Sequence, residues 1–113
     1  MKNSRMSILA AILLAGVIGC SSSSRPSVRV RNERATKANV QFKDASGNTT
    51  NINDVSGGTT SAYTDIGTGA YTVTAVIQNE AISPTVTFTA LEDKSYTLVV
   101  LVGATPTLRV DLP

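Results

Sequence analysis

Few side chains in this 113-residue chain could take part in acid–base or nucleophilic catalysis. Histidine is absent and there is a single cysteine, so a histidine base, a Cys/His zinc site and an internal disulfide are all excluded. A serine or threonine nucleophile would need a lysine or carboxylate base, and Lys37, Lys43 and Lys94 fall in predicted exposed strands or turns. We therefore expect that the protein is not an enzyme.

One stretch of the chain is rich in the oxygen ligands that calcium prefers. These ligands are the side chains of Asp44, Ser46, Asn48, Asn51, Asn53 and Asp54. Their spacing does not match a calcium loop, because the glycine comes at position 47 and the terminal Glu is missing. A polar hairpin turn accounts for the same residues, so we expect no metal site here.

Basic residues gather near the beginning of the predicted domain. They are Arg29, Arg31, Arg34 and Lys37, and the first two alternate with valines and therefore point outward from a strand. Such a cluster could bind phosphates, peptidoglycan carboxylates or an acidic polysaccharide. Alternatively, these are solvated charges that keep an edge strand from pairing with other chains. Aromatic residues are not interleaved with them, which argues against nucleic acid as a partner.

One predicted strand, residues 98–102, is apolar on both of its faces. Val99 and Leu101 point away from the core predicted for this strand, and Val76 could join them from a neighbouring strand. Either a loop or the C-terminal segment of the same domain covers these side chains, or they form a surface for a protein partner.

The first nineteen residues have the layout of a secretory signal. Lys2 and Arg5 provide a basic start, residues 8–18 form an uncharged apolar run, and small residues lead to Cys20. The run would cover only about 16 Å as a helix, which is too short to span a membrane. We predict that residues 1–19 are a cleaved signal peptide. Its removal leaves eight basic and eight acidic side chains, and a net charge of zero.

The end of this signal, Val17-Ile18-Gly19-Cys20, resembles the lipobox of bacterial lipoproteins. The resemblance implies that Cys20 becomes the first residue of the mature chain and carries a diacylglycerol and an N-acyl chain, with no other cofactor. Together these chains would give stable membrane attachment. The alternative is an ordinary signal followed by a free or buried cysteine. The residue after the cysteine is Ser21 and not an aspartate, which implies that the lipoprotein is sent to the outer membrane. We expect it on the periplasmic face of that membrane. Residues 20–27 are predicted to be a lipidated cysteine followed by a Ser-rich tether.

From Val28 onward, apolar residues recur with a period of two, which is typical of half-buried strands. The alternation is clear over residues 28–31, 40–43, 71–77, 85–90, 96–102 and 108–112, and weaker around Ile52 and over 59–64. Turn residues such as Gly57-Gly58 separate these runs. Residues 28–113 are therefore predicted to form an all-β domain, an antiparallel β-sandwich of about seven or eight short strands.

The order of these elements resembles a family of bacterial secreted and surface β-sandwich domains of unknown function. The resemblance rests on VRVRNERATKANVQFKD, IGTGAYTVTAV and LEDKSYTLVVLVG, and its pattern is similar to transthyretin-like and immunoglobulin-like modules. A more distant likeness is to accessory proteins of bacterial alginate O-acetylation.

These observations together predict an outer-membrane-anchored lipoprotein that acts as a non-enzymatic binding or structural module of the cell envelope. Its partner is expected to be an envelope protein or a glycan, not a nucleic acid. One alternative is an accessory role in envelope polysaccharide modification or export. Another is binding of a glycan or phosphate through the cluster of Arg29, Arg31, Arg34 and Lys37.

Overall fold

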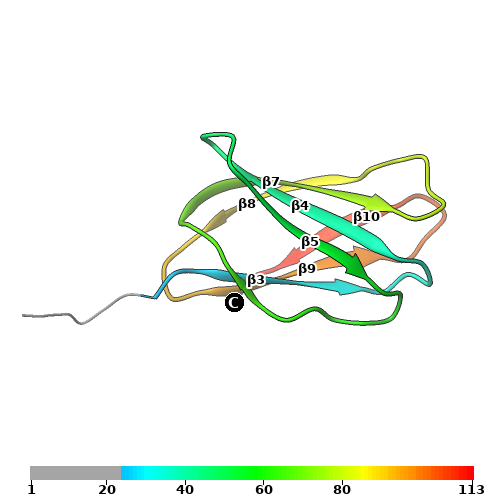
Figure 1. Cartoon of the computed structure of the whole chain (residues 1–113), viewed down its shortest axis with the longest axis horizontal. Helices are drawn as coiled ribbons and strands as arrows, with labels where there is room; N and C mark the ends of the chain where they lie inside the picture. Colours follow the sequence, from blue (N-terminus) through cyan, green and yellow to red (C-terminus); the bar gives the residue numbers. More distant parts are fainter. Residues whose placement is uncertain (1–23) are drawn as a thin grey trace, which may run out of the picture.

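The computed structural model describes residues 24–113, and these residues form two four-stranded β-sheets that pack face to face (Figure 1). The strands are β3 (Ser27–Asn32), β4 (Ala38–Asp44), β5 (Thr49–Val55), β6 (Thr64–Asp65), β7 (Gly69–Ile77), β8 (Thr85–Ala90), β9 (Ser95–Leu101) and β10 (Thr107–Asp111). The predicted all-β sandwich is thereby confirmed. No helix within these residues is long and apolar enough to cross a membrane.

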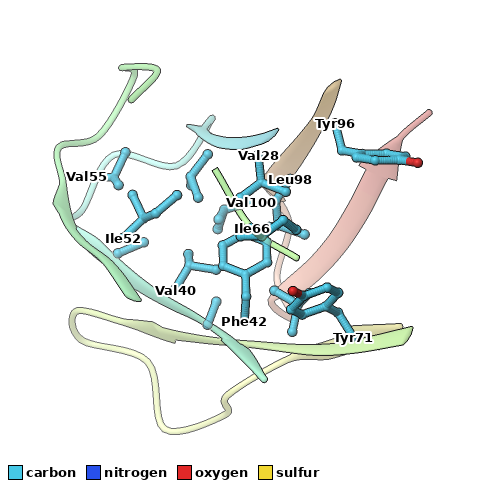
Figure 2. Close-up of a cluster of buried hydrophobic side chains, with 14 of the residues drawn as sticks. Val28, Val40, Phe42, Ile52, Val55, Ile66, Tyr71, Tyr96, Leu98 and Val100 are labelled. Atoms are coloured by element: carbon cyan, nitrogen blue, oxygen red, sulfur yellow. The ribbon is translucent and has the colours of Figure 1, made fainter. Parts of the chain in front are cut away.

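Alternating burial explains why the chain folds into two layers. In β4 and β7, side chains at every second position are buried and most of those between them are exposed. The buried members are Ala38, Val40, Phe42, Tyr71, Val73, Ala75 and Ile77. The two strands pair in antiparallel register, with Val40 opposite Ala75 and Phe42 opposite Val73, so their apolar sides face the same layer. Figure 2 shows the ring of Phe42 reaching from β4 into the space between the sheets.

The strand order is β10-β9-β3-β6 in one sheet and β5-β4-β7-β8 in the other. The strand pairs are antiparallel, as predicted, except that β3 runs parallel to β9, with Ser27 opposite Ser95 and Asn32 opposite Val100. Parallel neighbours cannot be joined by a tight turn. Here β4 to β8 lie between the two strands in the sequence, and this long connection makes the parallel pairing feasible.

The ordered domain begins earlier than its Ser-rich composition indicated. The backbone N–H and the hydroxyl of Ser24 donate to Asp93 Oδ1 at 2.6 and 2.8 Å, and Pro26 is buried. Ser27 is the first residue of β3. Residues 24–27, predicted as part of a flexible tether, therefore belong to the domain, because a turn 69 residues away supplies hydrogen-bond acceptors. Cys20 and the predicted signal peptide lie outside the described residues.

Asn32 is a buried polar residue that ties the two sheets together. Its Nδ2 donates to the carbonyl oxygens of Thr36 at 2.6 Å and Val55 at 3.0 Å. Its Oδ1 accepts the backbone N–H of Arg34 at 3.0 Å. Because Asn32 ends β3 and Val55 ends β5, this amide joins one sheet to the other with its donors and acceptor satisfied.

Candidate functional site

The predicted basic cluster does not converge on one site. Arg34 lies in the loop after β3, where its guanidinium donates to the carbonyl oxygens of Leu101 and Gly103 and pairs with Glu80 at 2.6 Å. Lys37 lies just before β4, and its Nζ is 3.9 Å from Asp54 Oδ1. These two residues thus have acidic partners of their own, away from the outer face of β3.

Arg29 and Arg31 do share the outer face of β3, but both are engaged there. Arg29 Nε donates to Thr97 Oγ1 at 3.0 Å, and its Cζ lies 4.8 Å from the centre of the Tyr63 ring. Arg31 Nε is 3.3 Å from Glu33 Oε2, without the alignment of a hydrogen bond, and its Nη2 is 3.6 Å from Asp111 Oδ2. This arrangement fits structural and solvated charges better than a single anion site.

The predicted partner surface of Val76, Val99 and Leu101 is not assembled. Val99 is 0% exposed and Leu101 is half-buried, whereas Val76 is 56% exposed but lies on β7 in the other sheet. In the sheet register, Val99 lies between Arg31 on β3 and Arg109 on β10. The aliphatic stems of these arginines shield it from water, so the outward side of β9 is covered within the domain.

An ion-pair network completes this cover. Asp111 Oδ1 accepts a hydrogen bond from Arg109 Nε at 2.7 Å, and Asp111 Oδ2 accepts one from Arg109 Nη2 at 3.3 Å. These hydrogen bonds hold the pKa of Asp111 below its ordinary value and raise the pKa of Arg109. The basic and acidic groups therefore neutralise one another above Val99, which leaves little charge free to attract a ligand.

The other sheet presents a surface of a different kind, which the sequence analysis missed. Side chains that point outward from β5, β4, β7 and β8 are almost all uncharged amides and threonines. We call this surface the amide–threonine face; it consists of Asn39, Gln41, Lys43, Thr49, Asn51, Asn53, Ala70, Thr72, Thr74, Val76, Thr85, Thr87 and Thr89. Lys43 is the sole charged member of this set; Asp54, at the bulge in β5, is also exposed and pairs with Lys37.

Strand register aligns these side chains in rows. One row crosses all four strands, from Asn51 through Gln41 and Thr74 to Thr85. Such a row places amide and hydroxyl groups at the regular spacing of neighbouring strands, about 4.8 Å. The face is therefore an ordered array of hydrogen-bonding groups rather than a random polar surface.

A hollow of about 190 Å³ lies in this face. It is lined by Asn39, Val40, Gln41, Asn51, Asn53, Thr74 and Val76, none of which carries a charge. The pairing of β4 with β5 shifts register between Ala38 and Val40, and the backbone of Asp54 adopts a φ of 57° beside this bulge. Asn39 Oδ1 accepts the N–H of Asp54 at 2.7 Å, which fixes the orientation of the Asn39 amide.

Most of the polar groups on the face have no partner within the domain. Among residues 24–113, its side chains make just two hydrogen bonds, the one from Asp54 to Asn39 and a 3.5 Å contact between Thr74 and Thr85. The amides of Gln41, Asn51 and Asn53 are thus free to bind water or a ligand. Each amide can both donate and accept, a capacity that suits a ligand rich in hydroxyl groups.

The signal for this face was present in the sequence, since amides and threonines alternate with buried apolar residues. Residue types alone do not single out this face, because Asn51 and Asn53 are equally suited to bind calcium or to form a polar hairpin. Asp44 does form the predicted polar turn, where its Oδ1 accepts the N–H groups of Ser46 and Asn48, each at 2.9 Å. In residues 24–113 no group of three or more His, Cys, Asp or Glu is placed to hold a metal ion.

Comparison with known proteins identifies the class of fold. No protein family matches the chain, and no curated protein does. Among solved structures, an NMR structure of a protein from Eubacterium rectale is similar, with a TM-score of 0.56, 17% identity, and coverage of 80% of this chain and 88% of that one. The N-terminal domain of AlgF from P. aeruginosa is similar with a TM-score of 0.55 and 23% identity, over 82% of this chain and 99% of that one. The protein is thus a small two-sheet all-β domain of the kind found in these structures.

Proposed function

We propose that this protein is a lipid-anchored accessory module of cell-envelope polysaccharide modification or export. It binds the polysaccharide through the amide–threonine face and performs no chemistry itself. The N-terminal domain of AlgF from P. aeruginosa is similar in fold over 82% of this chain and 99% of its own length. The resemblance of the sequence to accessory proteins of alginate O-acetylation supports the same role.

The single observation that carries the proposal is the uncharged hollow bounded by Asn39, Gln41 and Asn51. Amide groups at these positions can donate to and accept from neighbouring hydroxyls of a sugar ring. Val76, which is 56% exposed, and the threonine methyls offer apolar contact for the C–H side of the ring. Because the hollow lacks charge, recognition depends on the hydroxyl groups of the chain and not on carboxylates or phosphates.

The position of the anchor fits a role at the membrane surface. Lipidation at Cys20 would leave three residues between the lipid and Ser24, the first described residue, which contacts Asp93. An extended chain of that length spans at most about 14 Å. The domain would therefore lie close to the periplasmic face of the outer membrane, on the path of an exported polysaccharide.

Deletion of the gene tests the proposal. The expected result is a lower content of ester-linked acetyl groups, or less exported polymer, with synthesis of the polymer backbone intact. Complementation by the unaltered gene restores the phenotype, complementation by Gln41→Ala/Asn51→Ala does not, and Arg29→Gln on the opposite sheet restores it fully. Unchanged polysaccharide in the deletion strain would contradict the proposed function.

A further inference from the structure

The four edge strands of the sandwich are unequally protected against pairing with another chain. An exposed edge carries unpaired N–H and C=O groups, which proteins protect with short strands, charges, prolines or bulges. Strand β6 has two residues, β5 is interrupted by the register shift opposite Ala38, and β10 carries the ion pair of Arg109 with Asp111. Each of these three edges thus has one of the known protective features.

Strand β8 has none of these features. Its sequence TVTFTA contains no charge and no proline, and its pairing with β7 is continuous from Gly69 opposite Ala90 to Thr74 opposite Thr85. No residue of this strand has a positive φ. Among residues 24–113, no backbone hydrogen bond from a loop or turn reaches residues 85–90. Its outer row of backbone groups therefore has no hydrogen-bond partner among the described residues, on a strand of high β propensity.

An apolar groove runs beside this open edge. It has a volume of about 560 Å³, and its lining consists of Val86, Phe88, Leu108, Val110 and Leu112 together with Thr87, Thr89 and Arg109. Phe88 is half-buried and contacts Tyr71 and Tyr96 at ring-centre distances of 5.7 and 5.0 Å, so the floor of the groove is part of the aromatic core. Leu112 is 70% exposed. Apolar surface next to unpaired strand groups is the pattern of an edge that accepts another strand.

We propose that β8 pairs in antiparallel register with β8 of a second copy of this chain. A two-fold axis at Thr87 places Thr87 opposite Thr87 of the partner subunit and Val86 opposite Phe88 of the partner subunit. This register overlaps residues 85–89 of the strand and keeps every apolar side chain on the inner side. Because the strand is uncharged, it meets its own copy without like-charge repulsion, and threonines face threonines across the pair.

Self-pairing extends the sheet β5-β4-β7-β8 into one of eight strands. The amide–threonine faces of the two copies then join into one continuous surface, because Thr85, Thr87 and Thr89 lie at the junction. Closed two-fold dimers are also the commonest form of protein oligomer. The self-pairing stands on the edge and the groove alone and does not depend on glycan binding.

Co-purification of two differently tagged full-length copies in detergent tests this inference. Unaltered copies are expected to purify together. When both copies carry Thr87→Lys, the amount of the second copy recovered with the first should fall at least about tenfold, because like charges then face one another. A Thr87→Lys copy with a Thr87→Glu copy regains pairing. Thr72→Lys is the matched control, since Thr72 lies on the same face directly beside Thr87 but on the inner strand β7.

Two results would overturn the proposal. The first is failure of the unaltered copies to purify together, including the case in which another protein occupies the β8 edge. The second is recovery of equal amounts of the second tagged copy for Thr87→Lys and for Thr72→Lys. That result would place any self-association elsewhere on the molecule or in the detergent micelle.

Discussion

Arg31 on β3 and Asp111 on β10 approach to 3.6 Å across the outer surface of β9, the strand that lies between them. In the register of the sheet, Asp111 lies opposite Thr97, and Val99 lies between Arg31 and Arg109, whose aliphatic stems cover it. A strand that is apolar on both faces is thereby accommodated inside one domain. Charged residues that seemed candidates for ligand binding act instead as the cover of an apolar side chain.

The first prediction concerns Val99. The change Val99→Ala should lower the free energy of unfolding by about 1.5 to 3 kcal/mol, because it removes fully buried methyl groups and leaves a cavity. The control is Val76→Ala, the same change at a site that is 56% exposed, with an expected effect within about 0.5 kcal/mol. Urea unfolding measures both. Equal effects would show that β9 is not covered as described.

Asn32 gives the second prediction. The change Asn32→Ala should lower the free energy of unfolding by about 2 to 4 kcal/mol, because buried carbonyls of Thr36 and Val55 lose their donors. Asn32→Asp should lower the free energy of unfolding further, since a carboxylate would then face the carbonyl oxygens of Thr36 and Val55. Asn53→Ala, an exposed asparagine on β5, is the matched control and should be nearly neutral. Tolerance of Asn32→Ala would show that this amide does not tie the sheets together.

The third prediction is a pH dependence that originates at Asp93. Hydrogen bonds from the backbone N–H and the hydroxyl of Ser24 lower the pKa of this carboxyl. A lowered pKa in the folded state stabilises the protein above the ordinary carboxyl value of about 4 and stops doing so as the pH falls through the lowered pKa. The thermal midpoint of the unaltered protein should therefore exceed that of Asp93→Asn near neutrality, and the difference should shrink below about pH 4. A difference that stays constant down to about pH 2 would argue against this contact.

The fourth prediction concerns the membrane anchor. Replacement of Cys20 by Ala should abolish incorporation of labelled fatty acid and leave the signal peptide uncleaved, because the resemblance to a lipobox places both reactions at this residue. Labelling with palmitate measures the first effect, and the size of the protein on a denaturing gel measures the second. If the Cys20→Ala protein is processed normally and stays with the membrane fraction, that result alone would rule out the lipid anchor.

Features of the fold that depend on local alternation were predictable from the sequence. The buried positions of β4 and β7, and the turn at Asp44, follow from residue types within a few positions of one another. The parallel pairing of β3 with β9 was not predictable, because periodicity says which face a residue occupies but not which strand lies beside it. Cover of Val99 within the domain was one of the two alternatives that the sequence left open, but its position between Arg31 and Arg109 depends on strand pairing in the same way.

The candidate site follows the same division. Gln41, Asn51 and Thr74 lie on three strands, and their alignment in one row depends on registers that the sequence alone does not reveal. Conversely, Arg29, Arg31, Arg34 and Lys37 are close in sequence but are dispersed by the bend between β3 and β4 and by separate partners such as Glu80. Residues that are close in sequence are therefore separated in the basic cluster, whereas residues that are distant in sequence come together in the amide–threonine face.

The most direct test of the account is calorimetric titration of the full chain with purified envelope polysaccharide from the cells that make the protein. Binding through the amide–threonine face should be nearly unchanged between about 0.01 M and about 1 M salt, because hydroxyl recognition is not screened as charge pairs are. Binding should be lost in Gln41→Ala/Asn51→Ala and kept in Arg29→Gln. Binding that disappears at high salt and in Arg29→Gln, but survives loss of the two amides, would contradict the account.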